Sequence, residues 1–255
     1  MKHKKYADWK IDLFEDEKIL KDLLDFKAVR MLPEQMVSEL MTRDNPYARY
    51  AYGLWLWACH KDNESLKGAF KIFEESASAG IADALQMISR MYYIGEGYDE
   101  KSEKFVMNRE LSQDLAGQAV EKGSILAKLR GNKNLFWGTY EVDADRSAAI
   151  DEAERESSAA FSESILWTEQ LGNFYEIEGE REKAIKAYEK CIINGYYAPI
   201  YDLALTYLEE GDEDYYKTLM KLGMELGVPD CRILGMENEF RWESLSGDER
   251  LDIYR

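Results

Sequence analysis

Apolar residues recur along most of this chain at intervals of three and four positions, the spacing that places them on one face of an α-helix. Only four prolines interrupt the 255 residues, at positions 33, 46, 199 and 229. The stretches between them are rich in Ala, Leu, Glu and Lys, which favour helix. The pattern therefore predicts an all-α protein with at least ten helices and no sheet.

One arrangement of residue types returns several times and predicts the second helix of a repeated helix pair. An apolar residue stands four positions after a starting residue, a small residue seven positions after it and a glycine eleven positions after it. Offsets of four and seven share one helical stripe, and a terminal glycine suits a left-handed helix end. The copies are Ala69, Phe73, Ser76 and Gly80; Ser112, Ala116, Ala119 and Gly123; Ala184, Tyr188, Cys191 and Gly195; and Tyr216, Met220, Gly223 and Gly227. A weaker copy without the glycine is Ala149, Ala153, Glu156 and Ala160.

The segments that precede these copies predict the first helices of the pairs. They read YGLWL at 52–56, ISRMY at 88–92, LGNFY at 171–175 and LALTY at 203–207, each with a small residue beside an apolar or aromatic one. A small residue such as Gly172 lets two helices approach closely, where a bulky side chain would separate them. The spacing therefore predicts sequential, antiparallel helix pairs.

The segment 166–195 resembles the tetratricopeptide repeat, with Leu171 and Gly172 in its first helix and Ala184 and Tyr188 in its second. The lengths of the units vary along the chain, and a Gly-x-Gly turn at 95–97 precedes an acidic residue. Both features are similar to the Sel-1-like branch of that family.

This resemblance covers about residues 45–227, and the unit at 124–162 departs from it most. It implies a right-handed α-α superhelix, a solenoid of about five antiparallel helix pairs. Residues 1–44 are expected to form an N-terminal helical cap that includes helices at 12–27 and 33–41. Residues 228–255 are expected to form a C-terminal capping helix, from Pro229 to Phe240, and a tail.

The charge of the chain bears on its partners. Fifty acidic and 33 basic residues give a net charge of −17, which disfavours a nucleic-acid or anionic membrane partner. The acidity either keeps the protein soluble or complements a basic partner. The three cysteines show no spacing that suggests a disulfide, and the sequence shows no apolar signal core and no long apolar run. These features favour a cytoplasmic location.

Residues that carry common chemistries are scarce. The two histidines, His3 and His60, are not at metal-ligand spacing, and the 95–97 turn lacks the Lys-Ser/Thr of a phosphate loop. The acidic run at 209–214 lacks the alternating ligands of a calcium loop. We expect no cofactor, no metal and no catalytic residue, although carboxylates are abundant enough that an acid–base pair stays open.

The first helices line the concave surface of such a solenoid, so a partner is expected there. Positions three before, one after and four after the small residue share one face. In the first two pairs this face carries Tyr, Trp and Arg, which dominate interface hot spots. The predicted partner-binding residues are Tyr50, Leu54, Trp57, Gln86, Arg90, Tyr93, Glu169, Asn173, Glu176 and Tyr201.

The sequence thus favours a non-catalytic scaffold that binds a peptide or protein, either basic or of another kind, in its groove. One alternative is an immunity-type inhibitor of a toxin, which rests on the net charge of −17. The other is an enzyme that uses buried carboxylates with raised pKa values in a closed pocket.

Overall fold

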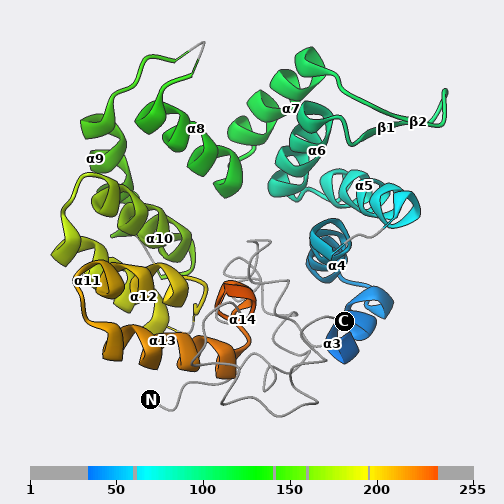
Figure 1. Ribbon diagram of the computed structural model, residues 1–255. Helices are drawn as coiled ribbons and strands as arrows, with labels where there is room; N and C mark the ends of the chain where they lie inside the picture. The colour runs from blue at the N-terminus through cyan, green and yellow to red at the C-terminus, as the bar shows by residue number, and fades with distance from the viewer. Residues whose placement is uncertain (1–33, 60–61, 140–141, 159–160, 195, 235–255) are drawn as a thin grey trace. The chain divides into compact units, whose positions relative to one another are not determined.

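Figure 1 shows the computed structural model of the chain, which describes residues 34–59, 62–139, 142–158, 161–194 and 196–234. Twelve helices and two short strands occur within these ranges. The helices are α3 (Glu34–Thr42), α4 (Pro46–Cys59), α5 (Asn63–Ser78), α6 (Ala82–Ile94), α7 (Arg109–Glu121), α8 (Ile125–Trp137), α9 (Arg146–Ser157), α10 (Phe161–Ile177), α11 (Arg181–Ile193), α12 (Ile200–Glu209), α13 (Glu213–Leu226) and α14 (Pro229–Leu234).

Successive helices pack against each other as neighbours. α4 packs on α5, α6 on α7, α8 on α9 and α12 on α13, while α5·α6, α7·α8 and α11·α12 join one pair to the next. Short loops connect most of these helices, which makes consecutive helices antiparallel. The prediction of an all-α fold built from sequential helix pairs is therefore confirmed for the described residues.

The described chain divides into two compact units, with the boundary between Gln170 and Leu171 inside α10. The N-terminal unit contains the pairs α4–α5, α6–α7 and α8–α9. In this unit α4, α6 and α8 lie on one side and α5, α7 and α9 on the other (Figure 1). The C-terminal unit contains the end of α10 and the helices α11 to α14.

Side-chain caps begin four of the five second helices. The carboxylate or amide oxygens of Asp62, Asn108, Asp145 and Asp212 each accept a bond from the backbone N–H three residues later. Such a cap is worth about 1 kcal/mol because it satisfies an otherwise unpaired donor. At the other end, Gly80, Gly123 and Gly227 have φ values of 97°, 85° and 86°, as the terminal glycine of the pattern predicts. Gly195 lies outside the described residues.

The predicted small residues stand at the contacts between paired helices. A methyl group on Gly53 of α4 would lie 2.8 Å from Ile72 Cγ2 of α5. Ser89 of α6 is fully buried, and its hydroxyl donates to the carbonyl oxygen of Ser112 in α7 at 2.7 Å. These close approaches confirm why the sequence keeps small residues there.

A two-stranded antiparallel ribbon between α6 and α7 corrects the expectation that no sheet would occur. Strand β1 (Gly97–Asp99) pairs with β2 (Lys104–Val106), and Tyr98 faces Phe105 across the ribbon with ring centroids 5.4 Å apart. Each strand has only three residues, too few to leave a detectable alternating pattern in the sequence. The Gly-x-Gly turn predicted at 95–97 leads directly into this ribbon.

The two ends of the array carry further helices. α3 packs on α4, close to where a helix at 33–41 was predicted. α14 begins at Pro229, as predicted, and packs on α13, where Cys231 comes against Gly223. The helix predicted at 12–27 and the continuation of α14 toward Phe240 lie outside the described residues.

Candidate protein-binding surface

Trp57, near the end of α4, contacts the first helix of the following pair. Its indole Nε1 donates to Glu96 Oε2 at 2.8 Å, and the Arg90 guanidinium lies 4.7 Å from its ring centroid. Both Trp57 and Arg90 are half-buried. The hydrogen bond and the cation–π contact therefore fix the orientation of the Trp57 ring between two helix pairs.

Tyr93 repeats this arrangement one pair further along. It lies three residues after Arg90 on α6, so both side chains share one helix face. The Arg130 guanidinium of α8 lies 5.1 Å from the Tyr93 ring centroid, and the tyrosine is still 49% exposed. A large aromatic side chain is thus held at the surface by a cation from the next pair.

The same face continues along α8. Arg130, Lys133 and Trp137 are spaced three and four residues apart, which places them on one side of the helix. Lys133 is exposed, and Trp137 is 57% exposed while its ring packs edge-on against Phe136 at 5.2 Å. We call these residues the cation–aromatic surface: Trp57, Arg90, Tyr93, Arg130, Lys133 and Trp137.

Four residues of the predicted partner-binding set are buried, and the structure corrects their assignment. Tyr50 and Leu54 have no exposed surface, and Gln86 and Glu169 are also buried. Tyr50 packs on Phe73 of α5 with ring centroids 5.8 Å apart. The position three residues before the small residue faces the protein interior in the first, second and fourth pairs, so it presents nothing to a partner.

Two predicted residues of the fourth pair bind an internal partner. The Tyr188 hydroxyl donates to Asn173 Oδ1 and to Glu176 Oε2, both at 2.9 Å, and Glu176 Oε1 also accepts from Thr206 Oγ1 at 3.1 Å. The Tyr188 ring lies directly over Gly172, which has no side chain to hold it away. Asn173 and Glu176 therefore join α10 to α11 and α12, instead of forming a free face.

Tyr201 is the predicted residue of the fifth pair. It is half-buried on α12, and burial raises the pKa of its phenol. It belongs to the C-terminal unit, whereas the residues of the cation–aromatic surface belong to the N-terminal unit. Its role in binding stays a prediction.

Sequence reasoning missed Glu96 and Arg130. The sequence indicates only a turn at Glu96, although a glutamate between two glycines lies where the backbone can bring it close to a neighbouring helix. Arg130 was missed because no small residue was recognised in α8. Asn132 occupies that position, since it follows Gly123 by the same number of residues as Ser89 follows Gly80.

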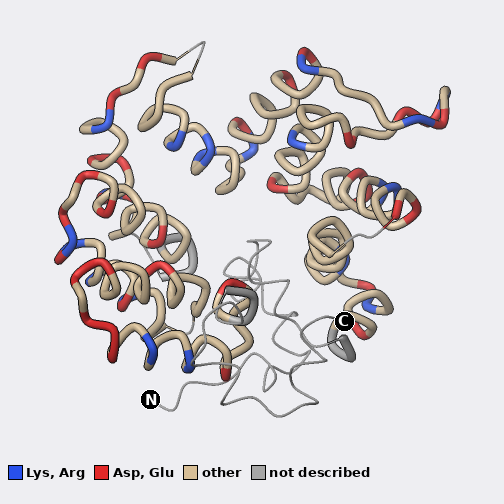
Figure 2. The backbone as a smooth tube through the Cα atoms, in the orientation of Figure 1, with Lys and Arg blue, Asp and Glu red and all other residues tan. Residues whose placement is uncertain are grey.

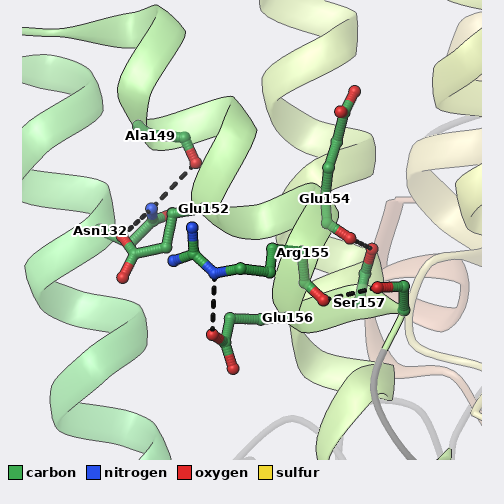
Figure 3. Close-up of polar contacts among 8 residues, drawn as sticks. Asn132, Ala149, Glu152, Glu154, Arg155, Glu156 and Ser157 are labelled. Atoms are coloured by element: carbon green, nitrogen blue, oxygen red, sulfur yellow. Dashed lines mark hydrogen bonds and ion pairs between the residues drawn. The ribbon is translucent and has the colours of Figure 1, made fainter.

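Asn132 joins three helices through its buried amide. Its Nδ2 donates to the Ala149 carbonyl oxygen at 2.9 Å and to Glu152 Oε2 at 2.6 Å, as Figure 3 shows. Its Oδ1 accepts from Gln170 Nε2 of α10 at 2.5 Å. The polar amide therefore replaces close packing as the link between α8 and α9, and it fixes the helix that bears Arg130.

The described residues offer little support for the enzyme alternative. Among them, no group of three or more His, Cys, Asp or Glu side chains is placed to hold a metal ion. Burial and nearby Glu100 raise the pKa of the Glu74 carboxyl group, but the residue is exposed on α5. In the part of the chain that the structure describes, no helix has the length and apolar character needed to cross a membrane.

A scan of protein-family models and a search of curated proteins each find no match. Among solved structures, the chain is similar to a Sel1 repeat protein from Oxalobacter formigenes at 17% sequence identity. The match covers 94% of this chain and 97% of that one, with a TM-score of 0.49. A likeness at this level adds nothing to the fold, which the sequential helix pairs of the chain establish by themselves.

Proposed function

We propose that this protein is a non-catalytic scaffold that binds a segment of another protein on the cation–aromatic surface. The observation that carries the proposal is Tyr93, which is 49% exposed although it is a large aromatic side chain held under Arg130. Tyr, Trp and Arg are the residue types that dominate interface hot spots. The surface lies on the first helices, where a solenoid forms its groove.

The contacts within the surface favour binding by lowering its entropic cost. Trp57 is bonded to Glu96, and Arg90 and Arg130 each stack on an aromatic ring. Side chains that are already ordered lose little freedom when a partner binds. The arrangement therefore suits recognition of an extended segment that crosses from α4 to α8.

Three further predictions rest on features outside the cation–aromatic surface. The net charge of −17 supports a basic partner or an immunity-type inhibitor of a toxin, but the cations of this surface do not. An enzyme with buried carboxylates would need a site outside the surface. Cytoplasmic location and the absence of a nucleic-acid or membrane partner are likewise proposals that rest on composition.

The test is capture of partner proteins from the native lysate by the full chain and by Tyr93→Ala. Tyr215→Ala is the matched control, because Tyr215 is 40% exposed on a second helix, α13. We expect Tyr93→Ala to lose a captured protein that both the unmodified chain and Tyr215→Ala retain. Equal capture by all three proteins, with circular dichroism unchanged, would show that the partner binds a surface without Tyr93.

A further inference from the structure

We infer that the cation–aromatic surface binds an acidic segment of its partner, although the protein itself carries a net charge of −17. The inference rests on the proposed function and adds the chemistry of the ligand. It depends on where the few cations lie and on what they contact, not on the overall composition.

The cations of α8 have no anionic partner in the part of the chain that the structure describes. Arg130 and Lys133 form no ion pair among the described residues, and the sequence of α8 contains no Asp or Glu. Figure 2 shows Lys and Arg along this helix. Some cations elsewhere meet carboxylates, as in Arg181–Glu209 at 2.9 Å and Arg49–Glu75 at 3.3 Å, while others such as Lys122 form no ion pair among the described residues. The specific feature of α8 is that its cations lie on a helix without acidic residues and next to exposed aromatic side chains, in a chain with 50 acidic residues.

Two acidic residues on or directly after these helices, Asp83 and Glu96, are bonded within the protein. Helices α4, α6 and α8 contain one acidic residue, Asp83, and it is buried. Its Oδ1 accepts hydrogen bonds from Ser124 Oγ at 2.5 Å and from the backbone N–H of Leu126 at 3.0 Å. Glu96, in the turn after α6, accepts from the Trp57 indole. These carboxylates hold helices and rings in place, so they leave the positive charge of Arg130 and Lys133 available to a ligand.

The geometry also indicates what else the segment carries. Tyr93 lies under Arg130, and Trp137 shares the helix face of Arg130 and Lys133, with the Arg146 guanidinium 5.7 Å from its ring centroid. Both rings are exposed, so apolar or aromatic ligand side chains would pack on them. Carboxylates of the ligand would accept charge-assisted hydrogen bonds from the guanidinium and ammonium groups. The acidic surface elsewhere disfavours non-specific binding of such a segment, because like charges repel. Acidic residues interleaved with apolar ones therefore fit this surface best.

A direct test uses two labelled peptides, one of alternating Glu and Leu and one of alternating Lys and Leu. Fluorescence anisotropy measures their binding to the full chain at about 0.15 M salt, where long-range charge effects are screened beyond about 8 Å. The variants are Lys133→Glu and the double change Arg130→Glu with Lys133→Glu. The matched control is Arg109→Glu with Lys122→Glu, which changes the net charge by the same amount. Both residues are exposed: Arg109 begins the second helix α7, and Lys122 directly follows its last residue.

We expect the Glu–Leu peptide to bind the full chain and the control, and to bind the double variant at least about tenfold more weakly. Lys133 is exposed and forms no hydrogen bond or ion pair among the described residues, so Lys133→Glu should weaken binding while circular dichroism stays unchanged. Preference for the Lys–Leu peptide, or equal loss in the control, would overturn the inference. If Tyr93→Ala still loses partner capture in that case, the proposed scaffold function stands and only the acidic ligand is wrong.

Discussion

The guanidinium of Arg90 lies 4.7 Å from the ring centroid of Trp57, which joins the first helices of two consecutive pairs. A double-mutant cycle with Trp57→Leu and Arg90→Ala should show a coupling of about 0.5–1 kcal/mol in the free energy of unfolding, because each change removes the same cation–π contact. Urea denaturation measures it. A cycle with Lys128→Ala in place of Arg90→Ala should be additive, since Lys128 is exposed and shares no described contact with Trp57. Additivity in both cycles would show that the contact contributes nothing.

Gly172 has no room for a side chain. A methyl group there would lie 2.5 Å from Tyr188 Cε1, and Tyr188 is fully buried with its hydroxyl bonded to two groups. Gly172→Ala should therefore destabilise the protein by about 1–3 kcal/mol through overpacking. Gly131→Ala is the control, because an added methyl meets nothing within 4 Å and alanine favours helix. The thermal midpoint should fall for Gly172→Ala and hold or rise for Gly131→Ala; the reverse order would exclude the close contact.

Asn132→Leu should be more damaging than its small change in volume suggests. The substitution removes bonds to the Ala149 carbonyl, Glu152 and Gln170, and it leaves buried polar groups unsatisfied. Each such group costs about 1–3 kcal/mol. Asn134→Leu, on the same helix and without a described side-chain hydrogen bond, should change unfolding by less than about 0.5 kcal/mol. Similar urea midpoints for the two variants would contradict the role of Asn132 as the link between α8, α9 and α10.

We expect the turn of the β1–β2 ribbon to depend on pH through Asp99. Hydrogen bonds from the Ser102 hydroxyl and then the Lys101 backbone N–H lower the pKa of Asp99 below its ordinary value of 3.8. The charged form is favoured in the folded ribbon, so its stabilisation is present above pH about 3.8 and is lost as pH falls through the folded pKa. NMR titration should report the lowered pKa, and Ser102→Ala should raise it toward 3.8. An identical titration of Asp99 in the variant would show that the Ser102 hydroxyl is not the main cause of the lowered pKa.

The helix pairs could be predicted because their constraints are local. Gly80, Gly123 and Gly227 mark helix ends, and small residues such as Gly53 and Ser89 mark where two helices meet. These requirements appear as residue types at fixed spacing. The ribbon at 97–106 was not predicted, because its strands are too short to leave an alternating pattern in the sequence.

The surface was only partly predictable, because periodicity gives a face of a helix and not what covers it. Tyr50 and Tyr93 both belong to the predicted face, yet Tyr50 has no exposed surface and Tyr93 is 49% exposed. The difference arises from contacts with neighbouring pairs, which no single helix encodes. Arg130 reaches Tyr93 from another pair, and the sequence of either helix alone does not indicate this contact.

The most direct measurement is photocrosslinking from the cation–aromatic surface in cells that contain the natural partner. Tyr93 is replaced by the photoreactive residue p-benzoylphenylalanine, and Tyr215 is replaced in a parallel control. Mass spectrometry then identifies the crosslinked peptides. The scaffold account predicts that position 93 crosslinks to one segment of one protein, rich in Asp and Glu, and that position 215 does not. Equal crosslinking from both positions, or none from position 93, would contradict the claim that this surface binds a partner.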